Sequence, residues 1–312
     1  MTNKNTSAFA GADLAAIVDI GSNSVRIMVC SNGKILFRDK KTTQLASGIE
    51  NKKLAYKSIN RTLDGIEELK IEAENFCKAS GYKKQPQLYA FATAAVRNSV
   101  NGGEFCKAAY ERFGIEIDVL SGESEAVLGL SGALGGKDGA IIDVGGGSTE
   151  VSVAKNGKIA YSKSVPLGAV VLSELCPREK SAAINKAQEY ISDFGDFGGV
   201  SFENGLCGIG GTSNTLAYIS CGARVYDREK QNGKVLTIDK LSGFLNEFFA
   251  LSPEDLAEKY NLDIRRANVL PFGAAIIYCV LSRAGLDRFT MTEGDNLEGY
   301  YRYLRGVTAY EK

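Results

Sequence analysis

The sequence contains no histidine among its 312 residues. Histidine is the commonest general base and a frequent zinc ligand, so its absence restricts both roles. Acid–base chemistry must therefore fall to carboxylates, lysine, tyrosine or cysteine. The seven cysteines include no CxxC pair, and their number is odd. A zinc site is not expected, and buried free thiols in a reducing cytosol are the simplest interpretation.

The sequence also lacks net charge, because 37 Lys and Arg balance 37 Asp and Glu. A protein that held polyanions through bulk charge alone would be basic. We expect no DNA partner. If the chain binds phosphates, it must use local devices, namely glycine-rich loops, helix N-termini and a few placed cations.

Long hydrophobic runs are missing as well. The longest apolar run, Val269 to Leu281, contains Pro271 and Gly273 and is shorter than the roughly 20 residues that a membrane span requires. Residues 1–13 are small and polar, without the basic and apolar segments of a signal peptide. We therefore expect a soluble, cytoplasmic protein with no membrane partner.

The sequence does have the length and apolar content for two domains, with 44% hydrophobic residues. Short apolar strands alternate with amphipathic helices, which predicts an α/β fold with largely parallel sheets. We place the boundary at Ser121–Gly122. Domain I then comprises residues 1–122 with a C-terminal helix in 296–312, and domain II comprises residues 123–295. Helices are predicted at 54–80, 103–113, 123–134, 181–194, 212–219, 239–250, 253–260, 264–284 and 296–304.

One strand–turn–strand motif occurs twice. Asp19-Ile-Gly-Ser-Asn-Ser24 matches Asp143-Val-Gly-Gly-Gly-Ser148 in a D-[IV]-G-x-x-S frame, and each copy follows a short apolar strand. A hairpin turn is predicted after each copy, at Asn32–Gly33 and Asn156–Gly157. One copy in each half suggests two related domains that face each other across a cleft.

Each copy has the composition of a phosphate cradle. Glycine lets the backbone approach closely, so that its N–H groups can bind phosphate, and hydroxyl groups add donors. Asp19 and Asp143 would repel phosphate unless Mg²⁺ lay between them. A tight β-turn is the alternative for either copy alone, but the matched pair favours a metal–phosphate clamp. The candidate phosphate contacts are Ser22, Asn23, Ser24, Gly145, Gly146, Gly147, Ser148 and Thr149.

A third glycine-rich segment, Gly208-Ile-Gly-Gly-Thr-Ser-Asn214, follows a strand and opens a helix. This context suits a phosphate or nucleotide contact at a helix N-terminus, through Gly210, Gly211 and Thr212. Close helix–strand packing is the alternative reason for its glycines.

These three segments together resemble the actin, Hsp70 and sugar-kinase superfamily, with its actin-like (ribonuclease H-like) ATPase fold. A narrower resemblance, from about Ala15 to Gly299, is to the exopolyphosphatase and guanosine pentaphosphate phosphohydrolase (Ppx/GppA) family. It implies a hydrolase that requires Mg²⁺ or Mn²⁺, in a possible homodimer. The segments that carry it are Asp19–Arg26, Thr93–Arg97, Ser121–Ala126, Asp143–Glu150 and Gly210–Thr212.

The resemblance also implies roles for single residues. Glu125 matches the catalytic base and Arg97 a phosphate contact, while Asp143 and Glu150 match the metal site, to which we add Asp19. Without histidine, a carboxylate is the natural group to orient water. A first-turn glutamate that merely favours the helix dipole is the alternative for Glu125.

Other assignments stay open. Glu123 competes with Glu125 as the base, and Arg97 has the alternative of an ordinary surface arginine. Arg26 faces either the cleft or solvent.

The sequence departs from the family pattern at two positions. Ser124 precedes Glu125 where another acid is common, and Leu297 occupies the arginine position of the usual Leu-Arg-Glu-Gly. One basic contact or domain-closing pair is then expected to be missing. Longer family members add a C-terminal helical region with a His–Asp metal motif, so the chain resembles the short two-domain form.

The leading hypothesis is an exopolyphosphatase that releases orthophosphate from linear polyphosphate by water attack. A guanosine pentaphosphate (pppGpp) 5′-phosphohydrolase is the close alternative, and the sequence does not separate the two. A small-molecule kinase of the same superfamily is favoured less, because the segment from Glu123 to Glu125 suits water better than a bound hydroxyl. A non-enzymatic polyphosphate or alarmone binder remains open because of Leu297.

Overall fold

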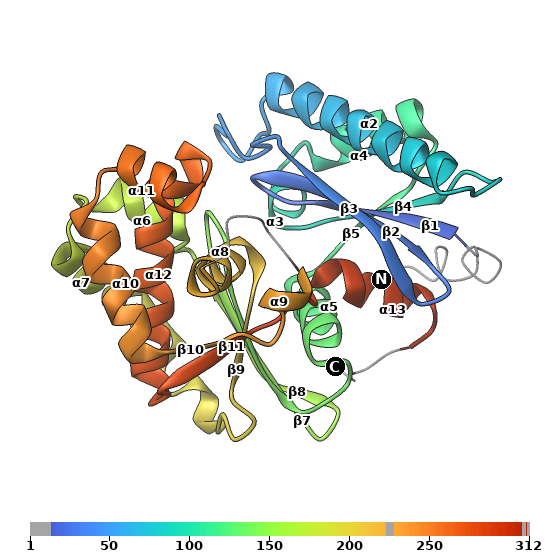
Figure 1. Cartoon of the computed structure of the whole chain (residues 1–312). Helices are drawn as coiled ribbons and strands as arrows, with labels where there is room; N and C mark the ends of the chain where they lie inside the picture. The colour runs from blue at the N-terminus through green and yellow to red at the C-terminus, as the bar shows by residue number, and fades with distance from the viewer. Residues whose placement is uncertain (1–13, 223–227, 308–309, 311–312) are drawn as a thin grey trace. The chain divides into compact units, whose positions relative to one another are not determined.

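The computed structural model describes residues 14–222, 228–307 and 310. Residues 1–13, on which the expectation of no signal peptide rests, lie outside this range. The chain forms two compact units (Figure 1). Unit 1 is Met1–Leu128 with Asn296–Thr308, and unit 2 is Gly129–Asp295 with Ala309–Lys312. The division lies inside helix α5 (Gly122–Leu134), at whose start the sequence-based boundary stands.

Unit 1 contains a five-stranded sheet with the order β3-β2-β1-β4-β5. Its first three strands form an antiparallel meander, and β4 and β5 continue the sheet in parallel. The strands are β1 (Leu14–Ile20), β2 (Ser24–Ser31), β3 (Lys34–Thr42), β4 (Gln87–Ala92) and β5 (Ile117–Val119). The helices besides α5 are α2 (Tyr56–Ala79), the short α3 (Ala94–Arg97), α4 (Gly102–Phe113) and α13 (Asn296–Leu304).

Strand β1 is buried along its whole length because both faces of the sheet are covered. Ala16 and Val18 pack in one core cluster with residues of α2 and α4. Ala15 and Ile17 pack in another with residues of α13. This alternation follows from the two-residue period of a strand.

Unit 2 contains a six-stranded sheet with the order β10-β11-β9-β6-β7-β8. Its strands are β6 (Gly139–Val144), β7 (Thr149–Lys155), β8 (Lys158–Val165), β9 (Leu206–Ile209), β10 (Val235–Thr237) and β11 (Arg288–Met291). Its helices are α6 (Ala169–Leu175), α7 (Lys180–Ile191), α8 (Gly210–Ser220), α9 (Arg228–Gln231), α10 (Ile238–Ala250), α11 (Pro253–Tyr260) and α12 (Ile264–Ala284), with 3₁₀ turns at Ser192–Phe194 and Phe197–Gly199.

Helix α12 is long and apolar enough to cross a membrane by length and composition. However, 67% of its most apolar window is buried inside the protein. It packs against α6, α7, α10 and α11, and Ala274 and Ile277 are fully buried. We therefore interpret α12 as the central core helix of unit 2.

The two meanders are copies of one structure. Asp19 lies opposite Arg26 in β1 and β2, and Asp143 lies opposite Glu150 at the equivalent position of β6 and β7. In both copies a pairing irregularity follows at the same distance, between Val29 and Cys30 in one and Val153 and Ala154 in the other. The predicted repeat is thus present in three dimensions.

The predicted hairpin turns are confirmed, because Asn32 and Asn156 have φ angles of 49° and 55° between paired strands. The expected α/β class, with two related domains of the actin-like ATPase type, is also confirmed by the common strand order. That the copies face each other across a cleft stays a prediction.

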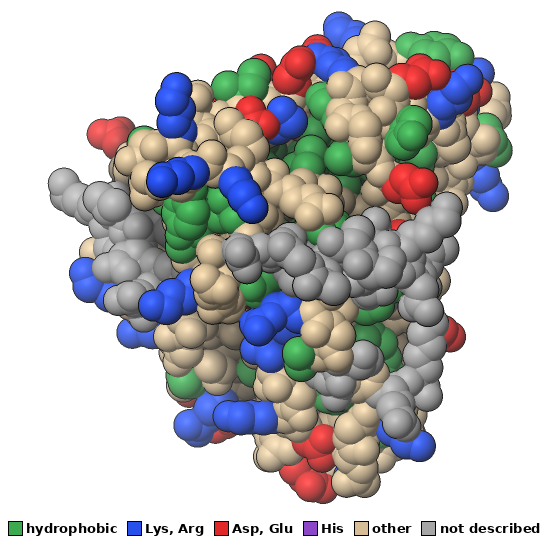
Figure 2. All heavy atoms as spheres, turned by 90° about the vertical axis from the view of Figure 1, so that its right-hand side faces the viewer, with side chains coloured by type: hydrophobic (Ala, Val, Ile, Leu, Met, Phe, Trp, Pro, Cys, Tyr) green, Lys and Arg blue, Asp and Glu red, His purple; other side chains and the backbone are tan. Residues whose placement is uncertain are grey.

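The remaining differences from expectation are local. The short strand β10 and the helix α6 were not predicted, and the end of the helix expected at 181–194 is a 3₁₀ turn. All seven cysteines are free thiols, as expected, but only Cys30, Cys77 and Cys279 are buried, whereas the other four are half-buried. Both signs of charge occur on the face shown in Figure 2, as zero net charge predicts.

Candidate functional site

The loop at residues 145–148 of unit 2, here called loop 2, is held from behind by helix α6. The N–H groups of Ala169 and Val170 donate to the carbonyls of Gly145 (2.9 Å) and Gly146 (3.0 Å). In a trans peptide the C=O and the following N–H point in opposite directions. The N–H groups of Gly146 and Gly147 are therefore directed away from α6, as an aligned pair of donors for an anion.

Gly168 makes this arrangement possible. A Cβ at this position would lie 2.3 Å from the carbonyl carbon of Gly146 and 2.5 Å from the nitrogen of Gly147. The close approach of two backbones requires glycine here. Gly168 lies three residues after the end of β8, outside the repeated motif, and was not predicted as a functional position.

Two of the predicted phosphate contacts face the protein interior. The Thr149 hydroxyl donates to the carbonyl of Leu167 at 2.6 Å, and the Thr212 hydroxyl donates to the carbonyl of Val144 at 3.0 Å. Both side chains are buried. Their hydroxyl protons thus fix the loops from inside, while Gly147 is exposed and Ser148 half-buried.

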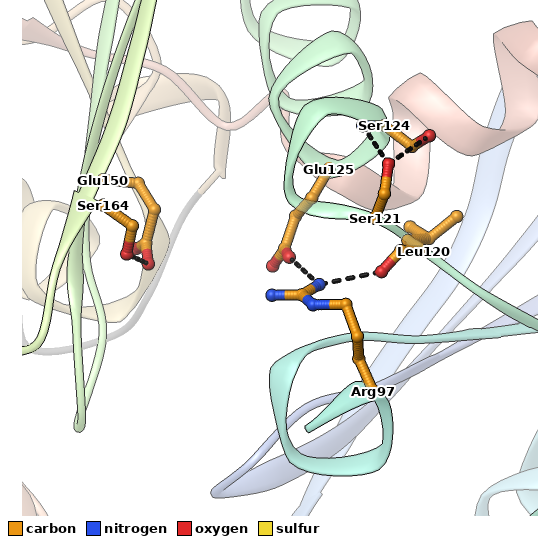
Figure 3. A network of polar contacts seen from close by, with 7 residues as sticks. All are labelled: Arg97, Leu120, Ser121, Ser124, Glu125, Glu150 and Ser164. Carbon is orange, nitrogen blue, oxygen red and sulfur yellow. Dashed lines mark hydrogen bonds and ion pairs between the residues drawn. The ribbon is translucent and has the colours of Figure 1, made fainter. Parts of the chain in front are cut away.

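Two acidic residues lie side by side on the strands that flank loop 2. Asp143 and Glu150 are direct cross-strand partners, so their side chains share one face of the sheet. Ser164, the partner of Glu150 on β8, donates to Glu150 Oε1 at 2.7 Å (Figure 3). A Cβ at Gly210 would lie 2.2 Å from Asp143 Oδ1, which places the N-terminus of α8 against this carboxylate.

A cation that the sequence analysis missed lies at the same helix N-terminus. A Cβ at Gly211 would be 2.7 Å from Arg266 Nη2. Burial lowers the pKa of the Arg266 guanidinium, but arginine keeps its charge in proteins. Gly211 and Arg266 are far apart in the sequence, so only the packing of α12 against α8 brings them together. A half-buried cation, the N-terminus of an eleven-residue helix and two glycines thus lie together.

The equivalent loop of unit 1, here called loop 1 (residues 21–24), has the same internal hydrogen bond. Gly21 N–H donates to Ser24 O at 3.1 Å, as Gly145 N–H does to Ser148 O at 3.0 Å. Arg26 contacts Asp19 through Nη2 and, at 3.0 Å, through Nε. Arg26, which the sequence left open, is therefore the partner of a buried aspartate.

The proposed base and the proposed phosphate-binding arginine contact each other. Arg97 Nη1 donates to Glu125 Oε2 at 3.0 Å and to the carbonyl of Leu120 at 2.8 Å (Figure 3). Both side chains stay partly open to solvent, at 29% and 25% exposure. The Arg97 guanidinium thus links Leu120, which directly follows β5, to the first turn of α5.

Ser121 caps the first turn of α5. Its Oγ accepts a hydrogen bond from Ser124 N–H at 3.1 Å and donates to Ser124 Oγ at 3.0 Å. Such a cap supplies a partner for an N–H group that has none within the helix. It also explains why a serine, rather than a second acid, suits position 124 next to Glu125. Glu123 is exposed.

The carboxylates of the site can be compared with the ligands that a metal ion requires. Among the described residues, no group of three or more His, Cys, Asp or Glu side chains is close enough to hold one. Mg²⁺ is commonly bound through only one or two carboxylates, with water and substrate phosphate completing its shell. The pair Asp143 and Glu150 fits that arrangement, whereas Asp19 is in contact with Arg26.

Leu297, at the usual arginine position, is a core residue. It is 1% exposed and belongs to the cluster that contains Phe91 and Tyr300. The neighbouring Glu298 forms an ion pair with Arg38 within unit 1. An apolar contact therefore stands where the family pattern has a basic one.

Residues 26–299 match the Ppx/GppA phosphatase family. A Ppx/GppA protein of known structure from Aquifex aeolicus is 25% identical, with 94% of this chain and 97% of that chain covered and a TM-score of 0.77. An exopolyphosphatase from Cytophaga hutchinsonii is 20% identical, with 96% and 100% covered and the same TM-score, which shows the shared fold.

A curated relative, the bifunctional 3-dehydroquinate synthase/phosphatase of Fusobacterium nucleatum, is 27% identical over 94% of this chain. The chain spans 46% of the length of that relative. The match from Arg26 to Gly299 covers most of both units, including loop 2 and the Arg97–Glu125 pair. The chain belongs to the Ppx/GppA phosphatase family.

Proposed function

We propose that this phosphatase is an Mg²⁺-dependent exopolyphosphatase that removes orthophosphate from the end of linear polyphosphate. The observation that carries the proposal is the combination in unit 2 of two adjacent carboxylates with aligned backbone donors. Carboxylates alone would repel a polyphosphate. Backbone amides alone would bind phosphate but would not favour a phosphate chain that carries a metal ion. Together they suit a phosphate chain that carries a divalent cation.

Mg²⁺ (or Mn²⁺), held by Asp143 and Glu150, would neutralise charge on the bound phosphate chain. The N–H groups of Gly146 and Gly147 bind phosphate oxygens without side-chain entropy. The sequence also predicts Asp19 as a metal ligand, but its contact with Arg26 suits it better to positioning that arginine.

Glu125 orients the attacking water and accepts its proton. It stands on a capped helix turn, and Arg97 fixes its carboxylate in one direction. Glu125 therefore has the rigid support that a general base requires. Arg97 has further donors on the same guanidinium, so it can hold Glu125 and contact phosphate together.

The alternative substrate is pppGpp, whose terminal phosphoanhydride requires the same chemistry. Loop 3 (residues 208–212) with Arg266 supports this alternative, because it adds a separate anion-binding position next to Asp143. A non-enzymatic binder and a kinase are favoured less, since Glu125 has the support expected of a water-activating group. A cytoplasmic location suits the seven free thiols, and a homodimer stays a prediction.

Phosphate release from polyphosphate, pppGpp and ATP tests this proposal. The experiment compares the wild type with and without chelator, and then after Mg²⁺ or Mn²⁺ is restored. We expect release from polyphosphate that stops with chelator and returns with metal. Full activity in excess chelator would refute the metal site. Faster turnover of pppGpp would select the alternative, and no release from any substrate would favour a binder.

A further inference from the structure

The backbone carbonyls of loop 2 accept hydrogen bonds from helix α6, whereas those of loop 1 accept them from a non-helical segment. In unit 2, Val170 N–H at the start of α6 donates to Gly146 O. In unit 1, Ala46 N–H donates to Ser22 O at 2.9 Å, at the equivalent position of the repeat. Residues 43–48, however, are not helical. A turn, in which Ser47 N–H donates to the Gln44 carbonyl at 2.9 Å, supports the segment from within, and further support comes from residues outside it.

Residues 43–47, here called the support segment, contact loop 1 on one side. Thr43 N–H (3.0 Å) and Gln44 N–H (2.8 Å) both donate to Asn23 O. With the bond to Ser22, these contacts fix two consecutive carbonyls. By trans-peptide geometry, the N–H groups of Asn23 and Ser24 then point to the opposite side. Of these two donors, Asn23 N–H is the equivalent of Gly147 N–H in loop 2.

On its other side, the support segment is held by helix α2. Arg61 donates through Nε to the Thr43 carbonyl and through Nη2 to the Gln44 carbonyl at 2.9 Å. Ser58 Oγ donates to the carbonyl of Ser47 at 2.8 Å. The planar fork of arginine can serve two neighbouring carbonyls at once, which the single ammonium of lysine does less rigidly.

Gln44 shows that this conformation is imposed. Its φ angle is 49°, in the left-handed region that a residue with a Cβ seldom adopts. The strain requires compensating contacts, and the Gln44 carbonyl accepts two hydrogen bonds, one from Ser47 N–H at 2.9 Å and one from Arg61.

We propose that Arg61 is a positioning residue for phosphate binding by loop 1. Through the carbonyls of Thr43 and Gln44 it fixes the amides that hold loop 1, and thereby directs the N–H groups of Asn23 and Ser24 toward the substrate phosphate. This role rests on the proposed phosphatase function. Arg61 itself does not contact substrate.

Arg61→Ala tests the proposal by two measurements. Amide hydrogen exchange at Thr43, Gln44 and Ala46 should become faster, whether or not the protein is active. In polyphosphate hydrolysis, KM should rise about tenfold with kcat nearly unchanged, because the lost contacts act in the ground and transition states alike. Arg112→Ala is the matched control and should leave both measurements unchanged. The Arg112 side chain pairs with Asp64 and Glu67 of α2 and lies over the Phe113 ring, and none of these residues belongs to the support segment.

Chemical rescue makes the test specific. Arg61 and Thr43 line an open cavity of about 760 Å³, which gives a small ion access to the vacated position. Guanidinium at non-denaturing concentration should lower KM of Arg61→Ala, whereas methylammonium should not. Ser58→Ala is the second variant if Arg61→Ala does not fold. It removes the contacts of Ser58 Oγ with the Ser47 carbonyl and with Arg61 Nη2 (3.2 Å), and should change exchange and KM in the same direction.

The outcomes separate this proposal from the proposed function. The positioning role would be overturned if amide hydrogen exchange at residues 43–46 were unchanged in Arg61→Ala. If Arg61→Ala does not fold, the same result in Ser58→Ala would overturn it. Faster exchange with an unchanged KM would overturn its link to phosphate binding. A wild type that hydrolyses neither polyphosphate nor pppGpp would refute the proposed function, while the exchange result would still decide whether Arg61 supports loop 1.

Discussion

Arg26 and Glu150 occupy the same position in the two copies of the repeated motif, each directly opposite the strand-end aspartate of its own unit. In unit 1 the arginine contacts Asp19. In unit 2 the glutamate lies opposite Asp143, an arrangement of like charges that a bound cation would stabilise. The same backbone arrangement thus carries two different electrostatic environments, and we propose that the metal binds in unit 2.

The first prediction concerns the base. Glu125→Gln keeps the shape of the side chain but removes the carboxylate that accepts a proton. We expect kcat to fall by roughly 10²–10⁴, with little change in KM. Glu123→Gln is the control, because Glu123 is exposed on the same turn. Steady-state phosphate release measures both, and the reverse pattern would identify Glu123 as the base.

The second prediction concerns Arg97. From the sequence alone, Arg97→Ala should mainly raise KM through the loss of a phosphate contact. The ion pair with Glu125 adds a fall in kcat, because the base loses its fixed orientation. A double-mutant cycle separates the two effects. In a Glu125→Gln background, Arg97→Ala should still raise KM but lower kcat no further; fully additive losses in kcat would contradict the coupling.

The third prediction concerns Ser164, whose hydroxyl fixes one oxygen of Glu150. Ser164→Ala should weaken metal binding by about tenfold, as expected when a partner of a metal ligand is removed. Mn²⁺ binding followed by electron paramagnetic resonance measures this without substrate. Ser162→Ala is the matched control, because Ser162 forms a hydrogen bond with Ser152 two residues along the same strand pair. Equal metal affinity in both variants would exclude the role of Ser164.

The fourth prediction concerns Gly168. Gly168→Ala should lower the free energy of unfolding by about 1–3 kcal/mol, because its methyl group would overlap the backbone of loop 2. KM should rise as well, since the aligned amides shift. Gly103→Ala in α4 meets nothing within 4 Å and should leave stability unchanged or slightly higher. Thermal unfolding of the two variants makes the comparison, and equal melting temperatures would show that the loop tolerates displacement.

The elements predicted well are those that local sequence determines. The repeated loops, both Asn-Gly turns and the helices at 253–260, 264–284 and 296–304 depend on nearby residues and a regular apolar period. The contacts between Arg61 and Thr43, or Arg266 and Gly211, depend instead on how helices pack against loops. No pattern within one segment contains that information. The packing of Leu297 is equally hidden from the sequence. The sequence shows that leucine stands at the usual arginine position, but not the core that surrounds it.

The return of the chain to unit 1 has a consequence for how the protein is made. Leu297, Tyr300 and Leu304 of α13 cover Ala15 and Ile17 of the first strand. On the ribosome, that strand emerges early, but its partners are synthesised only after the whole of residues 129–295. Unit 2 can thus complete its sheet during translation, whereas one face of unit 1 stays uncovered until residue 304 has left the exit tunnel. While residues 129–295 are synthesised, the nascent chain therefore carries exposed β1 surface, which makes that surface the expected binding site for a co-translational chaperone.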